Sequence, residues 1–403
     1  MRLLKGYRHL VLLFAVLLAV NLLGCSSTDR SSTAPQTVET AALSTQPVSS
    51  SQACILGDLD GDGQASIGDA IRILRIVVGI DPDDECADAN ENGNTDVGDA
   101  IKLLRCVVGL DPWPIHEVTY EFVTKWGSEG AGDGQFKDPD GLAVDADGNV
   151  YVTDWGNDCI QKFTRNGTFL TKWGSFGSDN GQFENPTDLA VGPDGSVYVT
   201  DSWNHRIQKF TSAGIFITKW GSQGAGDGEF QYPRPVAVDE DGNVYVGDRN
   251  NYRIQKFTST GTFITKWGSQ GSGDGQFNQP YGVAVDRNGN VYVADVYNHR
   301  VQKFTATGVF TAKWGSRGGA DAQFQTPTGV AVDASGNVYV ADKNNNRIQK
   351  FTSAGAFVIK WGVAGSGDGQ FDFPSRAAVD VDGNVYVTDY NNHRIQKFRP
   401  PTP

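Results

Sequence analysis

Two twelve-residue segments carry side-chain oxygens at a spacing that can wrap a calcium ion. Residues 58–69 and 88–99 place oxygen-bearing side chains at positions 1, 3, 5, 9 and 12, with glycine at position 6 for a sharp turn. Ca²⁺ takes about six to eight hard oxygen ligands, and position 7 of such loops supplies a main-chain carbonyl. We therefore expect two Ca²⁺ sites, with the ligands Asp58, Asp60, Asp62, Gln64, Ser66, Asp69, Asp88, Asn90, Asn92, Asn94, Asp96 and Asp99.

An apolar segment that predicts a helix follows each of these loops, at residues 70–78 and 100–108. Residues 54–111 hold four basic and thirteen acidic residues, for a net charge of −9. The final ligand of each loop is Asp and only one helix follows it, and in both respects residues 54–114 resemble a dockerin module. That resemblance implies calcium-dependent docking to a cohesin-like partner. The alternative is a calcium-stabilised spacer.

The N-terminus predicts export. Basic residues precede an apolar run at 10–23, which is shorter than the roughly 20 residues that span a bilayer. The run ends in Leu22-Leu23-Gly24-Cys25, which resembles the lipobox of bacterial lipoproteins. The resemblance implies that residues 1–24 are removed as a signal peptide and that Cys25 is lipidated. Residues 25–53, rich in Ser and Thr, then form a disordered tether, and the protein is anchored to a bacterial membrane, at the cell surface or outer membrane.

The charge balance argues against a nucleic-acid partner. The 403 residues include 34 basic and 47 acidic ones, for a net charge of −13. Nucleic-acid binding depends on Lys and Arg neutralising phosphates, and an acidic chain opposes it. We expect a monomer with no nucleic-acid partner.

The remainder of the chain repeats six times with a period of 47 residues. Each copy contains four short β-patterns, which in the fourth copy are 283–286, 290–295, 300–304 and 309–314, and Asn288-Gly289 signals a two-residue hairpin turn. Six such antiparallel units predict a β-propeller. Residues 122–126 have the fourth-strand pattern, so they are expected to complete the last blade and close the ring. The period is marked by Pro139, Pro186, Pro233, Pro280, Pro327 and Pro374.

The copies share the sequence Ala-Val-Asp…Gly-Asn-Val-Tyr-Val…Asn-x-Arg-Ile-Gln-Lys-Phe. This sequence is similar to the NHL repeat, and the similarity covers residues 121–399. The expected fold is therefore an all-β six-bladed β-propeller of NHL repeats at 115–403, preceded by a small all-α calcium-binding dockerin-like domain at 54–114.

Residues shared by all copies are interpreted as scaffold. An Asp at the end of the second β-pattern is expected to pair either with an Arg at the start of the third or with the main chain. In the first copy Cys159 replaces that Arg. His205, His299 and His393 are expected on outer turns, too far apart to share a metal ion.

A binding site requires residues that differ between copies. Loops that precede the first strand and loops between the second and third strands emerge on one face of an antiparallel blade. On this face the sequence predicts a ligand-binding mouth with an aromatic rim, whose flat amphipathic rings suit sugar faces or peptide side chains. The alternative is that these rings pack between neighbouring loops. The candidate residues are Asp140, Asp188, Arg234, Tyr281, Arg376, Trp155, Trp203, Tyr297 and Tyr390.

The favoured function is non-catalytic binding of a glycan, peptide or protein partner, and no catalytic residue is assigned. The alternatives are a propeller enzyme, a lyase or hydrolase acting on cell-envelope or extracellular polymers, and a purely structural scaffold. Ca²⁺ is the only cofactor that the residues imply.

Overall fold

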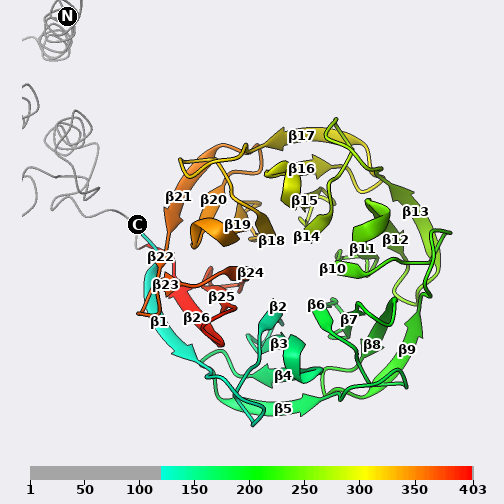
Figure 1. The fold of residues 1–403 in the computed structure, drawn as a ribbon, viewed down its shortest axis with the longest axis horizontal. Coiled ribbons are helices and arrows are strands. Elements are labelled where there is room, and N and C mark those ends of the chain that lie inside the picture. Colours follow the sequence, from blue (N-terminus) through cyan, green and yellow to red (C-terminus); the bar gives the residue numbers. More distant parts are fainter. Residues whose placement is uncertain (1–118, 402–403) are drawn as a thin grey trace, which may run out of the picture. The chain divides into compact units, whose positions relative to one another are not determined.

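Short runs of β-branched and aromatic residues, separated by glycine-containing turns, form the strands of this protein. The computed structural model describes residues 119–401, where each repeat folds into one four-stranded antiparallel sheet. These sheets, called blades 1 to 6, form a closed ring with the first strand of each blade nearest the centre and the fourth at the outside (Figure 1). The predicted signal peptide, tether and calcium module lie outside the described residues. No helix within 119–401 is long and apolar enough to cross a membrane.

The first three blades follow one another along the chain. Blade 1 consists of β2 Pro139–Val144, β3 Val150–Asp154, β4 Cys159–Phe163 and β5 Phe169–Trp173. Blade 2 consists of β6 Pro186–Val191, β7 Val197–Asp201, β8 Arg206–Phe210 and β9 Phe216–Trp220. Blade 3 consists of β10 Pro233–Val238, β11 Val244–Asp248, β12 Arg253–Phe257 and β13 Phe263–Trp267.

The last blade takes its outermost strand from the start of the propeller. Blade 4 consists of β14 Pro280–Val285, β15 Val291–Asp295, β16 Arg300–Phe304 and β17 Phe310–Trp314. Blade 5 consists of β18 Pro327–Val332, β19 Val338–Asp342, β20 Arg347–Phe351 and β21 Phe357–Trp361. Blade 6 consists of β24 Pro374–Val379, β25 Val385–Asp389, β26 Arg394–Arg399 and β1 Glu121–Trp126.

Short elements occupy the connections between these strands. A two-stranded parallel pair precedes blade 6, formed by β22 Val363–Ala364 and β23 Gln370–Phe371. Four of the loops between second and third strands contain a 3₁₀ turn, namely η2 Trp155–Asn157, η3 Arg249–Asn251, η4 Val296–Asn298 and η5 Lys343–Asn345.

The predicted ring closure is confirmed. Strand β1 pairs antiparallel with β26, with Glu121 opposite Arg399 and Trp126 opposite Ile395. Just before β1, the ring of Tyr120 stacks on Trp361 of blade 5 at a centroid distance of 4.2 Å. The two ends of the described chain are therefore joined within one sheet, which removes an exposed strand edge.

The hydrophobic core lies between blades rather than within one central mass. The second strands are buried along their whole length, because a neighbouring blade covers each of their faces. The cluster between blades 2 and 3 shows the pattern, with Tyr198 from one blade packed against Val244 and Phe257 of the next. Fourth strands alternate between exposed and half-buried positions, since they form the outer wall.

The turns between first and second strands differ from the prediction. In blade 4 the strands end at Val285 and resume at Val291, so the two-residue turn predicted at Asn288-Gly289 was wrong. The Asp286 carboxylate accepts the N–H groups of Asn288 and Asn290, both at 2.9 Å, and only Gly289 has positive φ, at 76°. The aspartate caps the turn, which favours a longer loop with glycine in the left-handed conformation.

The predicted Asp–Arg pairs are confirmed in five blades. In blade 2, Nε of Arg206 donates to the fully buried Asp201 at 2.6 Å, and the rest of the guanidinium donates to main-chain carbonyls, including that of Gln182. Burial raises the pKa of the Asp201 carboxyl, although the amide of Glu184 and Arg206 oppose this shift. The equivalent pairs are Asp248–Arg253, Asp295–Arg300, Asp342–Arg347 and Asp389–Arg394.

Blade 1 has a thiol where the other blades have a guanidinium. Sγ of Cys159 lies 3.8 Å from the carboxylate of Asp154, which also accepts the N–H of Lys137 and the side-chain amides of Asn157 and Gln161. Burial, reinforced by the charge of Asp154, raises the pKa of the Cys159 thiol to about 12. The thiol is therefore neutral and unreactive at physiological pH.

The three repeated histidines lie on the turns between second and third strands, as predicted, and each of them also contacts the next blade. Nδ1 of His205 accepts the main-chain N–H of Tyr232 in the next blade at 3.1 Å. His299 does the same for Thr326, at 3.2 Å. At equivalent seams the acceptor is a carboxylate or an amide oxygen instead, and the full set of pairs is His205–Tyr232, His299–Thr326, His393–Asp138, Asp158–Asn185 and Asn346–Phe373.

Candidate functional site

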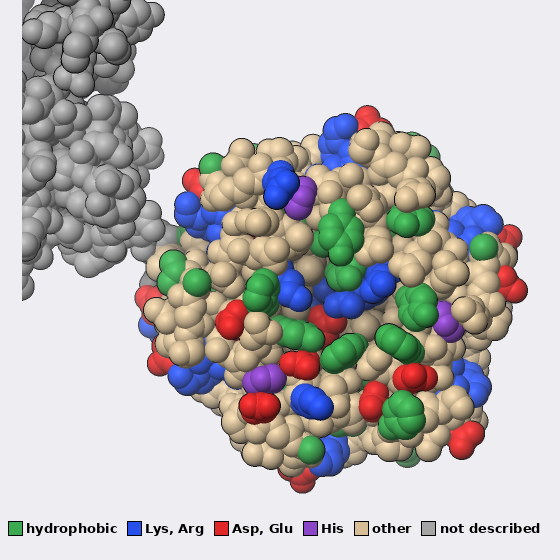
Figure 2. All heavy atoms as spheres, viewed as in Figure 1, with side chains coloured by type: hydrophobic (Ala, Val, Ile, Leu, Met, Phe, Trp, Pro, Cys, Tyr) green, Lys and Arg blue, Asp and Glu red, His purple; other side chains and the backbone are tan. Residues whose placement is uncertain are grey.

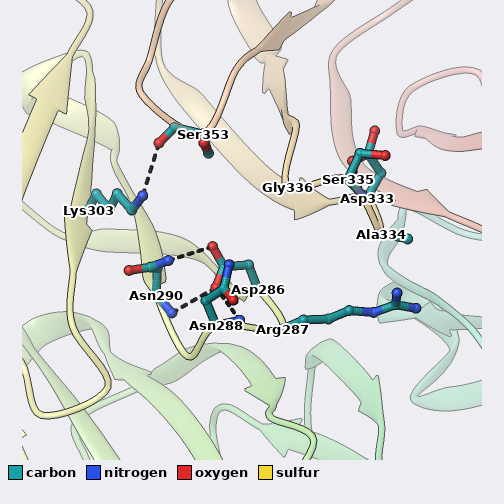
Figure 3. A pocket seen from close by; sticks show the side chains of 10 residues that line it. All are labelled: Asp286, Arg287, Asn288, Asn290, Lys303, Asp333, Ala334, Ser335, Gly336 and Ser353. Atoms are coloured by element: carbon teal, nitrogen blue, oxygen red, sulfur yellow. Dashed lines mark hydrogen bonds between the residues drawn. The ribbon is translucent and has the colours of Figure 1, made fainter.

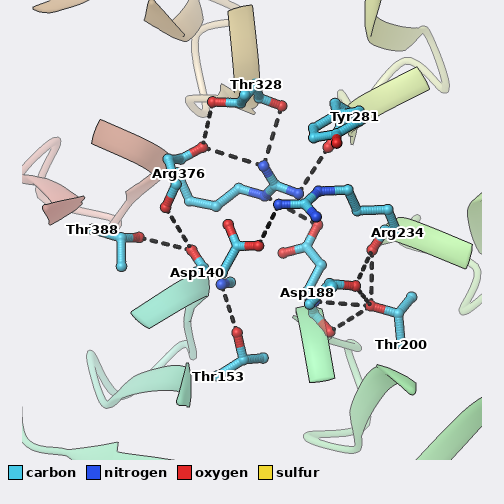
Figure 4. A network of polar contacts seen from close by, with 12 residues as sticks. Asp140, Thr153, Asp188, Thr200, Arg234, Tyr281, Thr328, Arg376 and Thr388 are labelled. Atoms are coloured by element: carbon cyan, nitrogen blue, oxygen red, sulfur yellow. Dashed lines mark hydrogen bonds and ion pairs between the residues drawn. The ribbon is translucent and has the colours of Figure 1, made fainter. Parts of the chain in front are cut away.

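The five candidate residues that follow the repeated prolines converge at the centre of the ring (Figure 4). They lie at the starts of the first strands of blades 1, 2, 3, 4 and 6, which run side by side around the channel. We call this group the mouth; it consists of Asp140, Asp188, Arg234, Tyr281 and Arg376.

Asp140 and Arg234 form an ion pair across the mouth. Nη2 of Arg234, in blade 3, donates to Oδ2 of Asp140, in blade 1, at 2.5 Å. The guanidinium also lies over the ring of Tyr281, 4.3 Å from its centroid. The other carboxylate oxygen of Asp140 and Nε of Arg234 are buried without a hydrogen-bond partner. The pair thus joins two blades that are not neighbours, and one polar atom of each side chain forms no hydrogen bond.

Arg376 and Asp188 form the second pair across the mouth. Nε of Arg376, in blade 6, lies 3.3 Å from Oδ2 of Asp188, in blade 2, as an ion pair without hydrogen-bond geometry. Nη2 of Arg376 donates to the carbonyl of Tyr281 at 2.8 Å, and Nη1 donates to the carbonyl of Thr328 at 3.2 Å. Burial raises the pKa of the Asp188 carboxyl even though Arg376 opposes the shift.

These charged side chains lie beneath the surface of the face. Asp140 is 2% exposed, Asp188 5% and Arg376 3%. A carboxylate buried to this degree is tolerated because a guanidinium compensates its charge. The sequence analysis named these four residues as candidates, but it did not predict that their charges neutralise one another.

The aromatic candidates form a rim around the mouth, on the loops between second and third strands. Trp203 and Tyr297 are half exposed, at 52% and 51%. Trp155 and Tyr390 are more covered, and burial raises the pKa of the Tyr390 hydroxyl to about 12. Trp203 packs edge-on against Tyr232 at a centroid distance of 5.8 Å. Some aromatic surface of the rim is therefore packed between neighbouring loops, and some of it remains exposed.

Two cations of the rim were missed by the sequence analysis. Arg249 and Lys343 are the first residues of η3 and η5, at the repeat position that Trp155 and Tyr390 occupy in blades 1 and 6. Nζ of Lys343 lies 4.7 Å above the ring of Tyr390. Nη1 of Arg249 lies 3.5 Å from the hydroxyl of Tyr281. Comparing that one position through all six copies would have revealed both residues.

Figure 2 shows the same arrangement on the surface of one face of the ring. Basic and acidic side chains adjoin at the centre, and hydrophobic side chains surround them. The charges are unevenly placed, since basic groups gather on one side of the centre and acidic groups on the other. This face therefore combines charged and hydrophobic surface.

A separate polar groove of about 210 Å³ lies between blades 4 and 5 (Figure 3). It is formed by turns between first and second strands, which lie on the face opposite the mouth. Asp286 binds the amides of its own turn there, and Nζ of Lys303 donates to the carbonyl of Ser353 at 3.1 Å. Because these contacts belong to the repeated turns, the groove is part of the scaffold.

The calcium ligands predicted between Asp58 and Asp99, and the lipidation site Cys25, lie outside the described residues. Within 119–401, no three His, Cys, Asp or Glu side chains are placed together so that they could hold a metal ion.

The NHL repeat model matches the chain six times, once in each blade. The matched segments are residues 136–163, 183–210, 230–257, 277–304, 324–351 and 371–398. No match to the chain was found among curated proteins.

Solved structures share the propeller fold at low sequence identity. A protein of unknown function from Bacteroides thetaiotaomicron is 21% identical, with a TM-score of 0.56, over 68% of this chain and 76% of that one. A streptogramin B lyase is 17% identical, with a TM-score of 0.50, over 68% and 97%. A gluconolactonase from Xanthomonas campestris is 12% identical, with a TM-score of 0.50, over 70% and 97%. Together with the repeat matches, these similarities identify residues 119–401 as a six-bladed β-propeller built from NHL repeats.

Proposed function

We propose that the propeller binds a glycan, peptide or protein partner at the mouth and its aromatic rim, without changing that partner chemically. The observation that carries the proposal is that the blades repeat one scaffold closely yet differ at the mouth and on its rim, where Trp203 and Tyr297 are each about half exposed. Large aromatic side chains that are partly exposed contribute strongly to binding interfaces.

The environment of the mouth carboxylates favours binding over catalysis. A general acid or base must come within hydrogen-bond reach of the proton it transfers. Asp140 is 2% exposed and bonded to Arg234, and Asp188 is 5% exposed and paired with Arg376. A ligand on the surface would meet aromatic rings and the cations of η3 and η5 before either carboxylate.

The test is binding of the full chain to an array of envelope glycans and peptides. The Trp203→Ala/Tyr297→Ala variant is expected to lose at least about tenfold in affinity, since truncating an interface anchor commonly costs more than 1 kcal/mol. The control is Val123→Ala/Leu170→Ala, which removes apolar surface that is 45% and 46% exposed on outer strands. Equal binding by both variants would contradict the proposed site.

An enzyme, a lyase or hydrolase acting on cell-envelope or extracellular polymers, is the second candidate. The observation in its favour is that burial raises the pKa of the Asp188 carboxyl, as an acid catalyst requires. The lyase and gluconolactonase named above share only the fold with this chain. Turnover of an array ligand that is lost in Asp188→Asn, with binding retained, would establish the enzyme.

We also propose that the protein is exported and lipid-anchored through Cys25. The lipobox-like sequence supports this proposal. A Cys25→Ser variant is expected to leave the membrane fraction and to incorporate no labelled fatty acid. Retention of the label would contradict the proposal.

The acidic residues of the two predicted loops support calcium-dependent docking through residues 54–114. Calorimetric titration of the full chain is expected to show two Ca²⁺ ions bound, and one in a variant with Asp58→Ala and Asp69→Ala. A cohesin-like partner is expected to bind only with Ca²⁺ present. Binding that chelation leaves unchanged would contradict the docking role.

A further inference from the structure

Two cations lie beside the paired charges of the mouth, although the chain as a whole has a net charge of −13. The carboxylates of Asp140 and Asp188 are each paired with one guanidinium. Beside them lie Arg249, 5.7 Å from the ring centroid of Tyr281, and Lys343, over Tyr390. Arg249 and Lys343 are therefore left outside the two internal ion pairs.

These two cations are held in place but not neutralised. Within residues 119–401, neither Arg249 nor Lys343 forms an ion pair with a carboxylate. Arg249 donates from Nε to the side-chain oxygen of Asn250 at 3.1 Å, and Lys343 contacts the rings of Tyr390 and Phe373. Cation–π contacts orient a cation without removing its charge. Both side chains can therefore still pair with an anion.

The surroundings of Lys343 also favour an anionic ligand. Burial lowers the pKa of its ammonium, and the nearby charges of Arg234 and Arg376 add to this effect, while Asp140 and Asp138 oppose it. An anion bound beside Lys343 would offset the repulsion from the two guanidinium groups.

We propose that Arg249 and Lys343 bind the carboxylate or sulfate groups of an acidic glycan whose sugar rings lie on the aromatic rim. The proposal rests on the proposed function, because it specifies the ligand class of the same site. Charge-assisted hydrogen bonds from Arg and Lys would supply the specificity for the charged groups.

The mouth suits a glycan better than an extended peptide, because its main-chain acceptors are already occupied. The carbonyl of Arg234 accepts a hydrogen bond from the hydroxyl of Thr200 at 2.8 Å, and the carbonyl of Tyr281 accepts one from Nη2 of Arg376 at 2.8 Å. The carbonyl of Asp140 likewise accepts Oγ1 of a threonine, at 3.0 Å. A peptide that adds as a strand needs free main-chain groups. The groups that remain free to contact a ligand are side-chain cations and flat aromatic rings, which suit the charged groups and the ring faces of acidic sugars.

The test is calorimetric titration of the full chain with polygalacturonate, alginate and a sulfated galactan, each beside its esterified or desulfated counterpart. At least one acidic polymer is expected to bind more tightly than its neutral counterpart, and added salt should weaken that binding. The Arg249→Gln/Lys343→Gln variant is expected to bind roughly 10- to 100-fold more weakly, since hydrogen bonds to charged groups contribute about 1.5–3 kcal/mol.

The control variant, Lys219→Gln/Arg287→Gln, removes the same charge from an outer strand and from a turn on the opposite face. It is expected to bind as the unmodified protein does. Thermal unfolding is measured for every variant. Arg249→Lys/Lys343→Arg keeps both charges and is expected to retain binding, which separates loss of charge from loss of folding.

The possible failures are distinguishable. Equal binding of acidic and neutral polymers, binding of an oligoglutamate peptide alone, or binding that Arg249→Gln/Lys343→Gln leaves unchanged would overturn the acidic-glycan inference. If binding is still lost in Trp203→Ala/Tyr297→Ala, the proposed function stands. Failure of every glycan and peptide to bind would overturn both.

Discussion

At the scale of single residues, the two ion pairs across the mouth connect blades that are not neighbours in the ring. Asp140→Asn leaves the guanidinium of Arg234 without its carboxylate, so we expect a loss of about 2–4 kcal/mol in the free energy of unfolding. The loss of unfolding free energy in Asp140→Asn/Arg234→Gln is expected to be smaller than the sum of the losses in the two single variants, because either substitution alone already removes the interaction. Urea unfolding of the four proteins measures the coupling.

The exposed pair of Lys172 and Asp133, with Nζ and Oδ1 2.7 Å apart, provides the control for this cycle. Its coupling is expected to be below about 1 kcal/mol, since solvent screens exposed ion pairs. A coupling between Asp140 and Arg234 no larger than this would contradict a structural role for the pair.

Cys159 marks a position where blade 1 departs from its neighbours. Asp154 is buried there without a cation, and burial raises the pKa of its carboxyl. Cys159→Arg is expected to recreate the pair found in the other five blades and to increase the free energy of unfolding by about 1–2 kcal/mol. The reverse change in blade 4, Arg300→Cys, should decrease it by about 3–5 kcal/mol. A lower unfolding midpoint for Cys159→Arg would show that blade 1 cannot accommodate the guanidinium.

At the scale of elements, histidine side chains join neighbouring blades only while Nδ1 is unprotonated. Burial lowers the pKa of His205 and His299, and Arg317 adds to the effect at His299. A lowered pKa in the folded state means that the unfolded state binds more protons as the pH falls. The contribution to stability is therefore complete above the unfolded pKa of about 6.5 and is lost as the pH falls through the folded value.

The sequence supplies its own replacement for these histidines, because Asn346 makes the same contact to Phe373 at 2.9 Å. The His205→Asn/His299→Asn variant is expected to keep its stability at pH 7.5. Between pH 6.5 and 4.5 it is expected to lose less stability than the unmodified protein. Thermal unfolding across this range is the measurement. Parallel pH profiles for the two proteins would refute the histidine contribution.

The elements were more predictable from the sequence than the contacts between them. The 47-residue period, the β-patterns and the Asp–Arg pairs are encoded locally and repeated, so the prediction of the strands and of ring closure was confirmed. The His205 contact joins loops of different blades, and the Asp286 turn depends on how a carboxylate folds back onto amides. The pairing of Asp140 with Arg234 depends on the width of the central channel, which no single repeat contains.

At the scale of the whole molecule, the ring is closed by a strand that comes from the opposite end of the propeller. Trp126 of β1 lies 5.9 Å from Phe163 and 6.3 Å from Tyr386, measured between ring centroids. Its equivalent Trp220, within an uninterrupted blade, makes the same two contacts at 6.0 and 6.2 Å. The closing seam is thus packed as closely as the seams between consecutive blades.

Trp126→Ala and Trp220→Ala are therefore expected to reduce stability equally, by about 3–5 kcal/mol each. Chemical denaturation followed by tyrosine and tryptophan fluorescence measures both variants. A much smaller loss for Trp126→Ala would indicate that the ring opens readily at β1.

The proposed function of the mouth and its rim is to bind a partner and leave it chemically unchanged. Its most direct test is to incubate the full chain with the best ligand of the glycan and peptide array, measure the affinity, and determine the mass of the recovered ligand. We predict an intact ligand whose binding is weakened at least about tenfold by Trp203→Ala/Tyr297→Ala and not by Val123→Ala/Leu170→Ala. A cleaved ligand, or binding that the rim variant retains, would contradict it.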